Sequence, residues 1–239
     1  MATYDLEQQE QLDQLKAFWK QYGNLITWLL VAALGAYAAW TGYLYWQQQR
    51  AQGAGGLYEE LDRAATAGDG AKVNQALADL KAKYAGTTFA EHGALLAARA
   101  AVSRKAPADA NAALQWLIQD GKTLDLVAVA RLRMAGQLMD DKKFDEALKV
   151  VSADMPPEFA AAAADRRGDI LVAQNKKDEA VKAYQEAYKA MPEELEYRRF
   201  IEGKLTVLGQ APAGSTVGTV SPMMQSLPPS LPPGLVPNR

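Results

Sequence analysis

Two short stretches decide the fold: DEALKVV at residues 145–151 and DEAVKAY at residues 178–184. They align without a gap at a spacing of 33 residues. A third stretch, DANAALQWL at residues 109–117, places Ala113 34 residues before Ala147. Self-similarity at this period is typical of arrays in which one helix pair stacks on the next. The sequence therefore predicts an all-α helical-repeat solenoid.

The copy around DEAVKAY carries the small and aromatic residues of a tetratricopeptide helix pair, at matching spacings: Gly168, Ala180, Tyr184, Ala187 and Pro192. Small side chains at Gly168 and Ala180 would let the two helices of one pair cross closely. Tyr184 would fill the gap to the next pair, and Pro192 would begin the following helix. Ala147 takes the place of Ala180 in the preceding, weaker copy. We interpret the body as tetratricopeptide-like, with an irregular helical bundle as the alternative.

Residues 57–208 show apolar side chains three and four positions apart, the period of amphipathic helices, and no convincing strand alternation. Breaks between helices are predicted where Gly, Pro and polar residues gather. They fall near Gly68–Gly70, Gly86–Thr88, Ala106–Pro107, Gly121–Thr123, Asp140–Lys143, Met155–Pro157, Asn175–Lys177 and Met191–Pro192. These breaks predict about nine helices joined by short turns.

The first helix of each pair lines the concave side of such a solenoid. The repeat register predicts a groove that is mostly apolar and carries two carboxylates, which could receive a helix or an extended segment. Its candidate residues are Leu95, Leu132, Gly136, Met139, Asp165 and Asp169. Interior packing at some of these positions is the alternative.

An apolar segment precedes the body, because no charged side chain occurs between Lys20 and Arg50. Residues 25–46 would form a helix of about 33 Å, enough to span the roughly 30 Å hydrocarbon core of a bilayer. Aromatic residues near both ends are typical of membrane interfaces, and small residues in the middle would permit close approach of a partner helix. The anchor residues are Leu25, Trp28, Gly35, Ala36, Ala39 and Trp46.

A cleaved signal peptide is the alternative to this single transmembrane helix, but the apolar run is too long and follows an acidic tail. Lys16 and Lys20 give a slight basic bias towards a cytoplasmic N-terminus. The predicted organisation is a cytoplasmic segment at 1–24, the membrane helix at 25–46 and a linker at 47–56. The helical domain follows at 57–208, and a disordered proline-rich tail at 209–239, where seven of the 11 prolines lie.

Composition excludes several classes of function. The net charge of −2 gives no positive field for nucleic acid, and the chain has no cysteine and a single histidine, His92. Thiolate and histidine metal sites are therefore not expected. No phosphate-binding glycine loop or nucleophile elbow occurs, so we expect no enzyme activity, cofactor or small-molecule substrate.

The chain resembles the YfgM family in its acidic N-terminal stretch (residues 4–7), in LDQLKAFWKQYGN (residues 12–24), and in a single span ending in YLYWQQQR (residues 43–50). Further matching stretches lie at 83–102, 129–148 and 164–188. That family comprises ancillary subunits of the bacterial Sec translocon with a tetratricopeptide-like periplasmic domain. The resemblance implies an inner-membrane protein with its body in the periplasm.

It also implies association with the SecYEG channel and with the membrane-anchored periplasmic chaperone PpiD, passing emerging chains to the chaperone network. The proline-rich tail departs from the family pattern. A different function stays open from the residues themselves: a tetratricopeptide-type scaffold or regulator in envelope assembly or cell division, not bound to the translocon.

Overall fold

The computed structural model describes residues 3–212, and every regular element in that range is a helix. The α-helices are α1 (Thr3–Thr66), α2 (Gly70–Tyr84), α3 (Thr88–Ser103), α4 (Pro107–Asp120), α5 (Leu124–Asp140), α6 (Phe144–Val151), α7 (Ala160–Ala173), α8 (Lys177–Ala190) and α9 (Tyr197–Val207). A 3-10 turn, Pro157–Phe159, precedes α7. Each predicted break falls between two helices, and the all-α prediction is confirmed. The tail prediction from residue 213 onward lies outside the described residues.

The chain divides into two compact units after Gly56. The first holds most of α1, whose 64 residues form one uninterrupted helix. The sequence predicts a linker at 47–56, whereas these residues are helical in the structure. Gln47–Gln49, Ala51 and Ala54 favour a helix, and this outweighs glycines that cost about 1 kcal/mol each in a helix interior.

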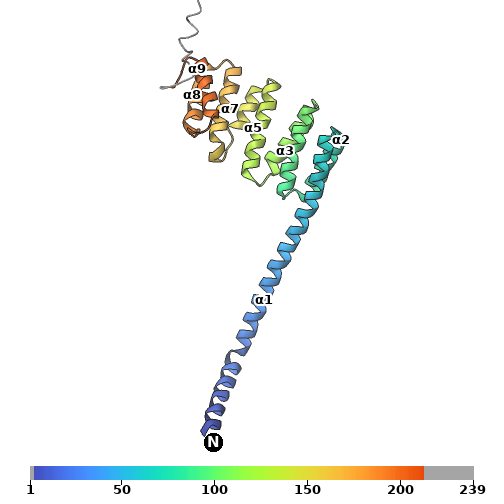
Figure 1. Cartoon of the computed structure of the whole chain (residues 1–239), viewed down its shortest axis with the longest axis vertical. Coiled ribbons are helices and arrows are strands. Elements are labelled where there is room, and N and C mark those ends of the chain that lie inside the picture. The colour runs from blue at the N-terminus through green and yellow to red at the C-terminus, as the bar shows by residue number, and fades with distance from the viewer. Residues whose placement is uncertain (1–2, 213–239) are drawn as a thin grey trace, which may run out of the picture. The chain divides into compact units, whose positions relative to one another are not determined.

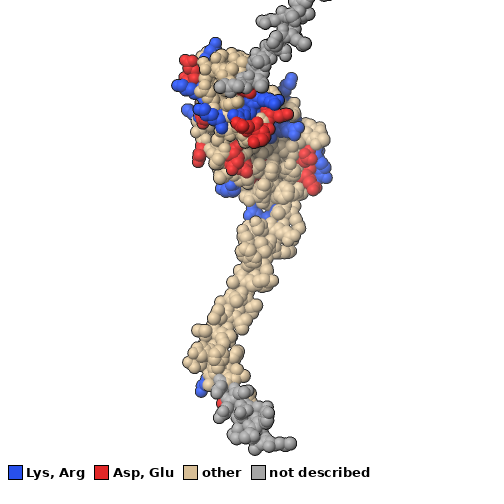
Figure 2. Space-filling model, turned by 60° about the vertical axis from the view of Figure 1, so that its left-hand side comes forward, with Lys and Arg blue, Asp and Glu red and all other residues tan. Residues whose placement is uncertain are grey.

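In the second unit, helices α3 and α4, α5 and α6, and α7 and α8 pack as pairs, and the first helices of successive pairs contact each other. Figure 1 shows α3, α5 and α7 side by side in the order of the sequence. A helical-repeat stack is therefore the architecture of the body. On the face in Figure 2, basic and acidic side chains are interspersed over this unit.

The turn inside each pair has the same backbone geometry, which is direct structural support for the repeat. Lys105, Lys142 and Asn175 each adopt a left-handed conformation, with φ of 58°, 60° and 61°. The residue after each of them donates its backbone amide to the carbonyl of the residue five positions before that donor. Lys143 donates to Leu138 at 2.8 Å, and Lys176 donates to Leu171 at 2.9 Å. This is the hydrogen-bond pattern that ends a helix in a Schellman motif.

The positions of these turns correct the sequence alignment that matched Ala113 with Ala147. Ala147 and Ala180 are the fourth residues of α6 and α8, and both have 0% exposure. The fourth residue of α4 is Ala110, also at 0%, so Ala110 rather than Ala113 occupies the repeat position. The first spacing is therefore 37 residues, mainly because α5 has 17 residues whereas α7 has 14.

Gly168 on α7 lies directly against the ring of Tyr184 on α8, and a Cβ atom at Gly168 would overlap that ring. Ala180, Tyr184 and Ala187 are buried in one apolar cluster with Ile201 and Leu205 of α9. Small residues thus let α7 and α8 approach, and Tyr184 fills the space towards α9. Pro192 differs from the expectation: it lies in an exposed turn, and α9 begins only at Tyr197.

Candidate docking groove

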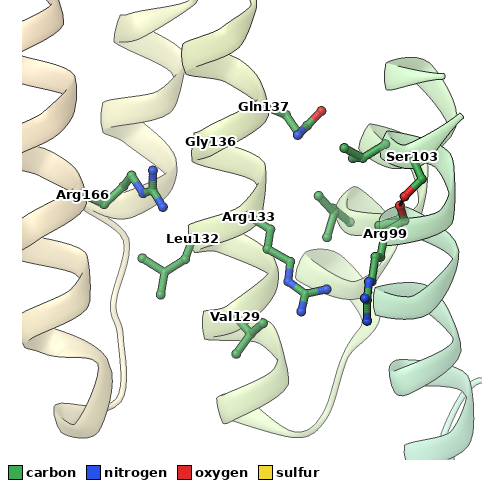
Figure 3. Close-up of a pocket in the computed structure, with 11 residues that line it drawn as sticks. Arg99, Ser103, Val129, Leu132, Arg133, Gly136, Gln137 and Arg166 are labelled. Atoms are coloured by element: carbon green, nitrogen blue, oxygen red, sulfur yellow. Dashed lines mark hydrogen bonds between the residues drawn. The ribbon is translucent and has the colours of Figure 1, made fainter. Parts of the chain in front are cut away.

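A hollow of about 450 Å³ opens between the first helices of the three pairs. Its side chains come mainly from α3, α5 and α7, and Figure 3 shows Val129 and Leu132 of α5 projecting into it. The apolar and small residues that line it are Ala98, Val102, Leu114, Val129, Leu132 and Gly136. A concave apolar surface of this kind can receive side chains of a bound segment.

Three arginines border the hollow: Arg99 on α3, Arg133 on α5 and Arg166 on α7. In Figure 3, Arg166 reaches in from α7, while Arg133 and Arg99 extend on the other side of Leu132. Nη1 of Arg133 donates to the backbone carbonyl of Leu95 at 3.2 Å. Within the described part of the chain, none of the three arginines forms an ion pair. The groove therefore combines an apolar floor with three arginines that form no ion pair with a described carboxylate, and Glu158 and Asp165 lie beside Arg166 in the adjoining hollow.

A second hollow of about 640 Å³ shares Leu132 and Arg166 with the first. It continues towards the end of the body and is lined largely by apolar residues of the 3-10 turn, α7 and the connection after α8. These include Phe159, Ala161, Ala162, Met191, Pro192 and Leu195. Because the two hollows share lining residues, the groove extends beyond the reach of a single bound side chain.

Only some of the six predicted groove residues line the hollow. Leu132 and Gly136 line the hollow. Leu95 is buried, 8% exposed, and contributes its carbonyl rather than its side chain, while Met139 is half-buried and does not line either hollow. Sequence analysis missed the three arginines, although Arg133 and Arg166 each stand nine residues before a left-handed turn residue.

Asp165 and Asp169 are not free carboxylates on an open groove. Nζ of Lys204, on α9, lies 2.8 Å from Oδ1 of Asp165 and 2.6 Å from Oδ1 of Asp169. The hydroxyls of Tyr197 and Tyr184 donate to Asp165 and Asp169, respectively, at 2.8 Å each. Asp165 borders the second hollow but is only 4% exposed. The two carboxylates therefore fasten α8 and α9 to α7, which corrects their prediction as ligand-facing groups.

The titration behaviour of this cluster follows from its burial. Desolvation, and then the hydrogen bond to Asp169, raise the pKa of Tyr184 well above its ordinary value. Burial and the hydrogen bond to Asp165 raise the pKa of Tyr197 in the same way. Burial alone would lower the pKa of Lys204, but its bonds to Asp165 and Asp169 raise it overall. All three groups are thus held in the protonated form that makes the cluster.

With this geometry established, comparison with known proteins places the chain. Residues 16–210 match the tetratricopeptide repeat-like domain family. The ancillary SecYEG translocon subunit of Neisseria gonorrhoeae is 30% identical over 87% of this chain and 100% of that protein. This chain belongs to the YfgM family. Proteins of the same name are 27% identical in Escherichia coli, over 80% of this chain and 91% of that protein, and 25% identical in Haemophilus influenzae, over 77% and 90%.

This YfgM family member combines the repeat body with an apolar N-terminal helix. Among the described residues, the segment Leu15–Thr66 of α1 is long and apolar enough to cross a membrane, with a mean hydropathy of 1.5 in its most apolar window. None of that window is buried. Leu25, Trp28 and Trp46 are 62%, 67% and 52% exposed, and Gly35, Ala36 and Ala39 are uncovered as well. Apolar surface of this extent fits a membrane location.

One buried carboxylate in this YfgM family member escaped sequence analysis. Glu91 of α3 is 1% exposed, and its Oε1 accepts the backbone amides of Lys122 and Thr123 at 2.5 Å and 3.1 Å. These amides precede α5, so Glu91 joins the first pair to the start of the second. An acid in the first turn of a helix is usually explained by the helix dipole, and this hides its long-range role.

Proposed function

We propose that this YfgM family member is a membrane-anchored adaptor that associates with the Sec translocon and links emerging polypeptides to periplasmic chaperones. The observation that carries this proposal is the apolar groove across α3, α5 and α7, on a chain whose relatives are named ancillary SecYEG translocon subunits. A groove of this kind supports binding without turnover. Within the described residues, no group of three or more His, Asp or Glu side chains could hold a metal ion.

The proposed organisation follows the sequence boundaries. Residues 1–24 lie in the cytoplasm, residues 25–46 cross the inner membrane, and residues 57–208 form a periplasmic docking domain. The slight excess of lysine before the span supports this orientation. The face formed by Gly35, Ala36 and Ala39 contacts a transmembrane helix of the translocon, because small side chains permit close approach and no described residue covers them.

Photocrosslinking from the span in intact membranes tests association with the translocon. A crosslinker at Gly35 or Ala36 should give adducts with channel subunits, and one at Tyr37, which projects from nearly the opposite side of the helix, should give fewer. Adducts with division or envelope-assembly proteins, and none with the channel, would support a scaffold that is independent of the translocon.

Protease protection tests the topology separately. Protease added outside spheroplasts should digest the body beyond Arg50 and leave a tag at Met1 intact. Digestion of the tag with protection of the body would contradict the proposed orientation, whatever the crosslinking shows.

A further inference from the structure

The arginines beside the groove select what the groove binds. We propose that the groove formed by Arg99, Arg133, Arg166 and the apolar floor around Leu132 takes an extended segment of another protein in which every third side chain is a carboxylate and the two between are apolar. This inference deepens the proposed docking function and rests on it. It concerns the chemistry of the docked segment rather than the identity of the partner.

The charge of the three arginines favours an acidic partner. Arg99, Arg133 and Arg166 come from three successive pairs and converge on one hollow, although the chain as a whole carries a net charge of −2. None forms an ion pair within the described residues, whereas Arg104, Arg167 and Arg198 each do. Guanidinium groups without such an ion pair attract carboxylates and repel lysine-rich and arginine-rich segments.

The distance between neighbouring helices sets the spacing of carboxylates in the bound segment. Helices α3 and α5 contact each other, as do α5 and α7, and packed helices lie about 8–10 Å apart. A chain in the polyproline II conformation has three residues per turn and advances about 3.1 Å per residue, so carboxylates at every third position share one face and would meet successive arginines. The residues between the carboxylates would face the apolar floor. Gly136 leaves room there, because a Cβ atom at this position would still lie 4.0 Å from Nη1 of Arg166.

The shape of the site favours a polypeptide over a membrane surface. The hollow is concave and about 450 Å³, and it continues into the second hollow past Leu132 and Arg166. Anionic headgroups on a flat bilayer could reach rim arginines but could not occupy an apolar floor. Side chains of a bound segment can do both.

The test uses the full-length chain in nanodiscs of neutral lipid and fluorescent peptides of about 12 residues, long enough to cross three helices at about 3.1 Å per residue. One peptide has Glu at every third position with Leu and Ala between. The second has Gln in place of Glu, and the third has Lys. At low salt the acidic peptide should bind at least about ten-fold more tightly than the Gln peptide. This difference in affinity should shrink as the salt concentration rises.

The decisive variant is the double substitution Arg99→Gln and Arg166→Gln, because these two side chains donate no hydrogen bond to another described residue, unlike Arg133. It should abolish the preference for the acidic peptide, so that the variant binds the acidic and Gln peptides with equal affinity. The control is Lys182→Gln with Lys189→Gln, which removes the same charge from exposed positions on α8 and should keep the preference.

Three results would overturn the inference. Equal affinity for the acidic and Gln peptides would leave a docking groove without acid selection, so the proposed function could still hold. Equal loss of preference in the lysine control would assign the effect to net charge. Absence of peptide binding, together with arginine-dependent binding to vesicles rich in anionic lipid, would assign the arginines to the membrane surface.

Discussion

The hydroxyl of Tyr184 donates to Asp169 at 2.8 Å, and the ring of the same tyrosine covers the preceding residue, Gly168. One side chain of α8 therefore fixes both the distance and the rotation of α7. The same carboxylate accepts from Lys204, so the pair formed by α7 and α8 is closed by α9. Stability of the last repeat should depend on this arrangement more than on any surface feature.

Adding one methyl group should have opposite effects at two helical glycines. Gly168→Ala would force its Cβ atom into the ring of Tyr184 and should lower the free energy of unfolding by about 1–3 kcal/mol. Gly136→Ala meets only Arg166, at 4.0 Å, and should raise stability by up to about 1 kcal/mol through helix propensity. Urea denaturation of both variants measures the difference. Equal effects of the two substitutions would refute the close crossing of α7 and α8.

Removal of Lys204 should destabilise the last pair. Lys204→Met leaves Asp165, 4% exposed, and Asp169 without their cation, and should cost roughly 1–3 kcal/mol. The partial exposure of Lys204 keeps this below the cost of breaking a fully buried pair. Lys182→Met on the exposed side of α8 should stay within about 0.5 kcal/mol and serves as control. Thermal melting measures both variants. Equal losses of stability in Lys204→Met and Lys182→Met would contradict a stabilising role for the cluster.

Asp169→Lys should unfold this end of the body. It removes the acceptor of Tyr184 and places a second cation beside Lys204. Loss of partner binding in this variant therefore carries no information about the groove.

Alkaline pH should weaken the same cluster. The unfolded chain releases tyrosine protons near pH 10, whereas the folded chain retains them on Tyr184 and Tyr197, whose pKa values are raised. The raised pKa of Lys204 acts in the same direction. Stability from these groups is therefore complete below about pH 10 and decreases as pH rises above it. Melting followed from pH 8 to about 11 should show the decrease, and Tyr184→Phe with Tyr197→Phe should reduce the slope; an unchanged slope would exclude the two tyrosines as its source.

Glu91 should be necessary for the junction between the first two pairs. Glu91→Ala leaves the amides of Lys122 and Thr123 without their acceptor and should cost about 1–3 kcal/mol. Glu91→Gln keeps one acceptor oxygen and should lose less. Hydrogen exchange measures the effect locally, because the amides of Lys122 and Thr123 should become faster in the alanine variant. Unchanged exchange at both amides would show that Glu91 does not hold the loop.

Local signals predicted the helices of the body well, because clusters of Gly, Pro and polar residues separate them, whereas the glycines within 53–56 do not interrupt α1. The repeat at 145–151 and 178–184 was also readable, because Ala147, Ala180 and Tyr184 are fixed by packing between neighbouring helices. The register of the first pair was not readable: alanine is common throughout α4, so Ala113 and Ala110 look alike until the turn at Lys105 separates them.

The site was harder to predict for the same physical reason. Asp165 and Asp169 project from the first helix of a pair, as groove residues do, but their partners Tyr197 and Lys204 lie more than 30 residues away. Sequence periodicity gives the face of a helix and not the identity of what covers it. Arg99 and Arg166 were overlooked because an exposed arginine on a helix usually indicates only a solvated surface.

The central claim is that the groove docks partner proteins, and photocrosslinking from Leu132 in living cells tests it most directly. Leu132 lines both hollows, whereas Lys182 is exposed on α8, outside the lining of either hollow, and provides the matched position. We predict adducts with translocon-associated periplasmic chaperones or emerging chains from Leu132 and few from Lys182. A folded protein that gives no adducts from Leu132, or equal adducts from both positions, would contradict the account.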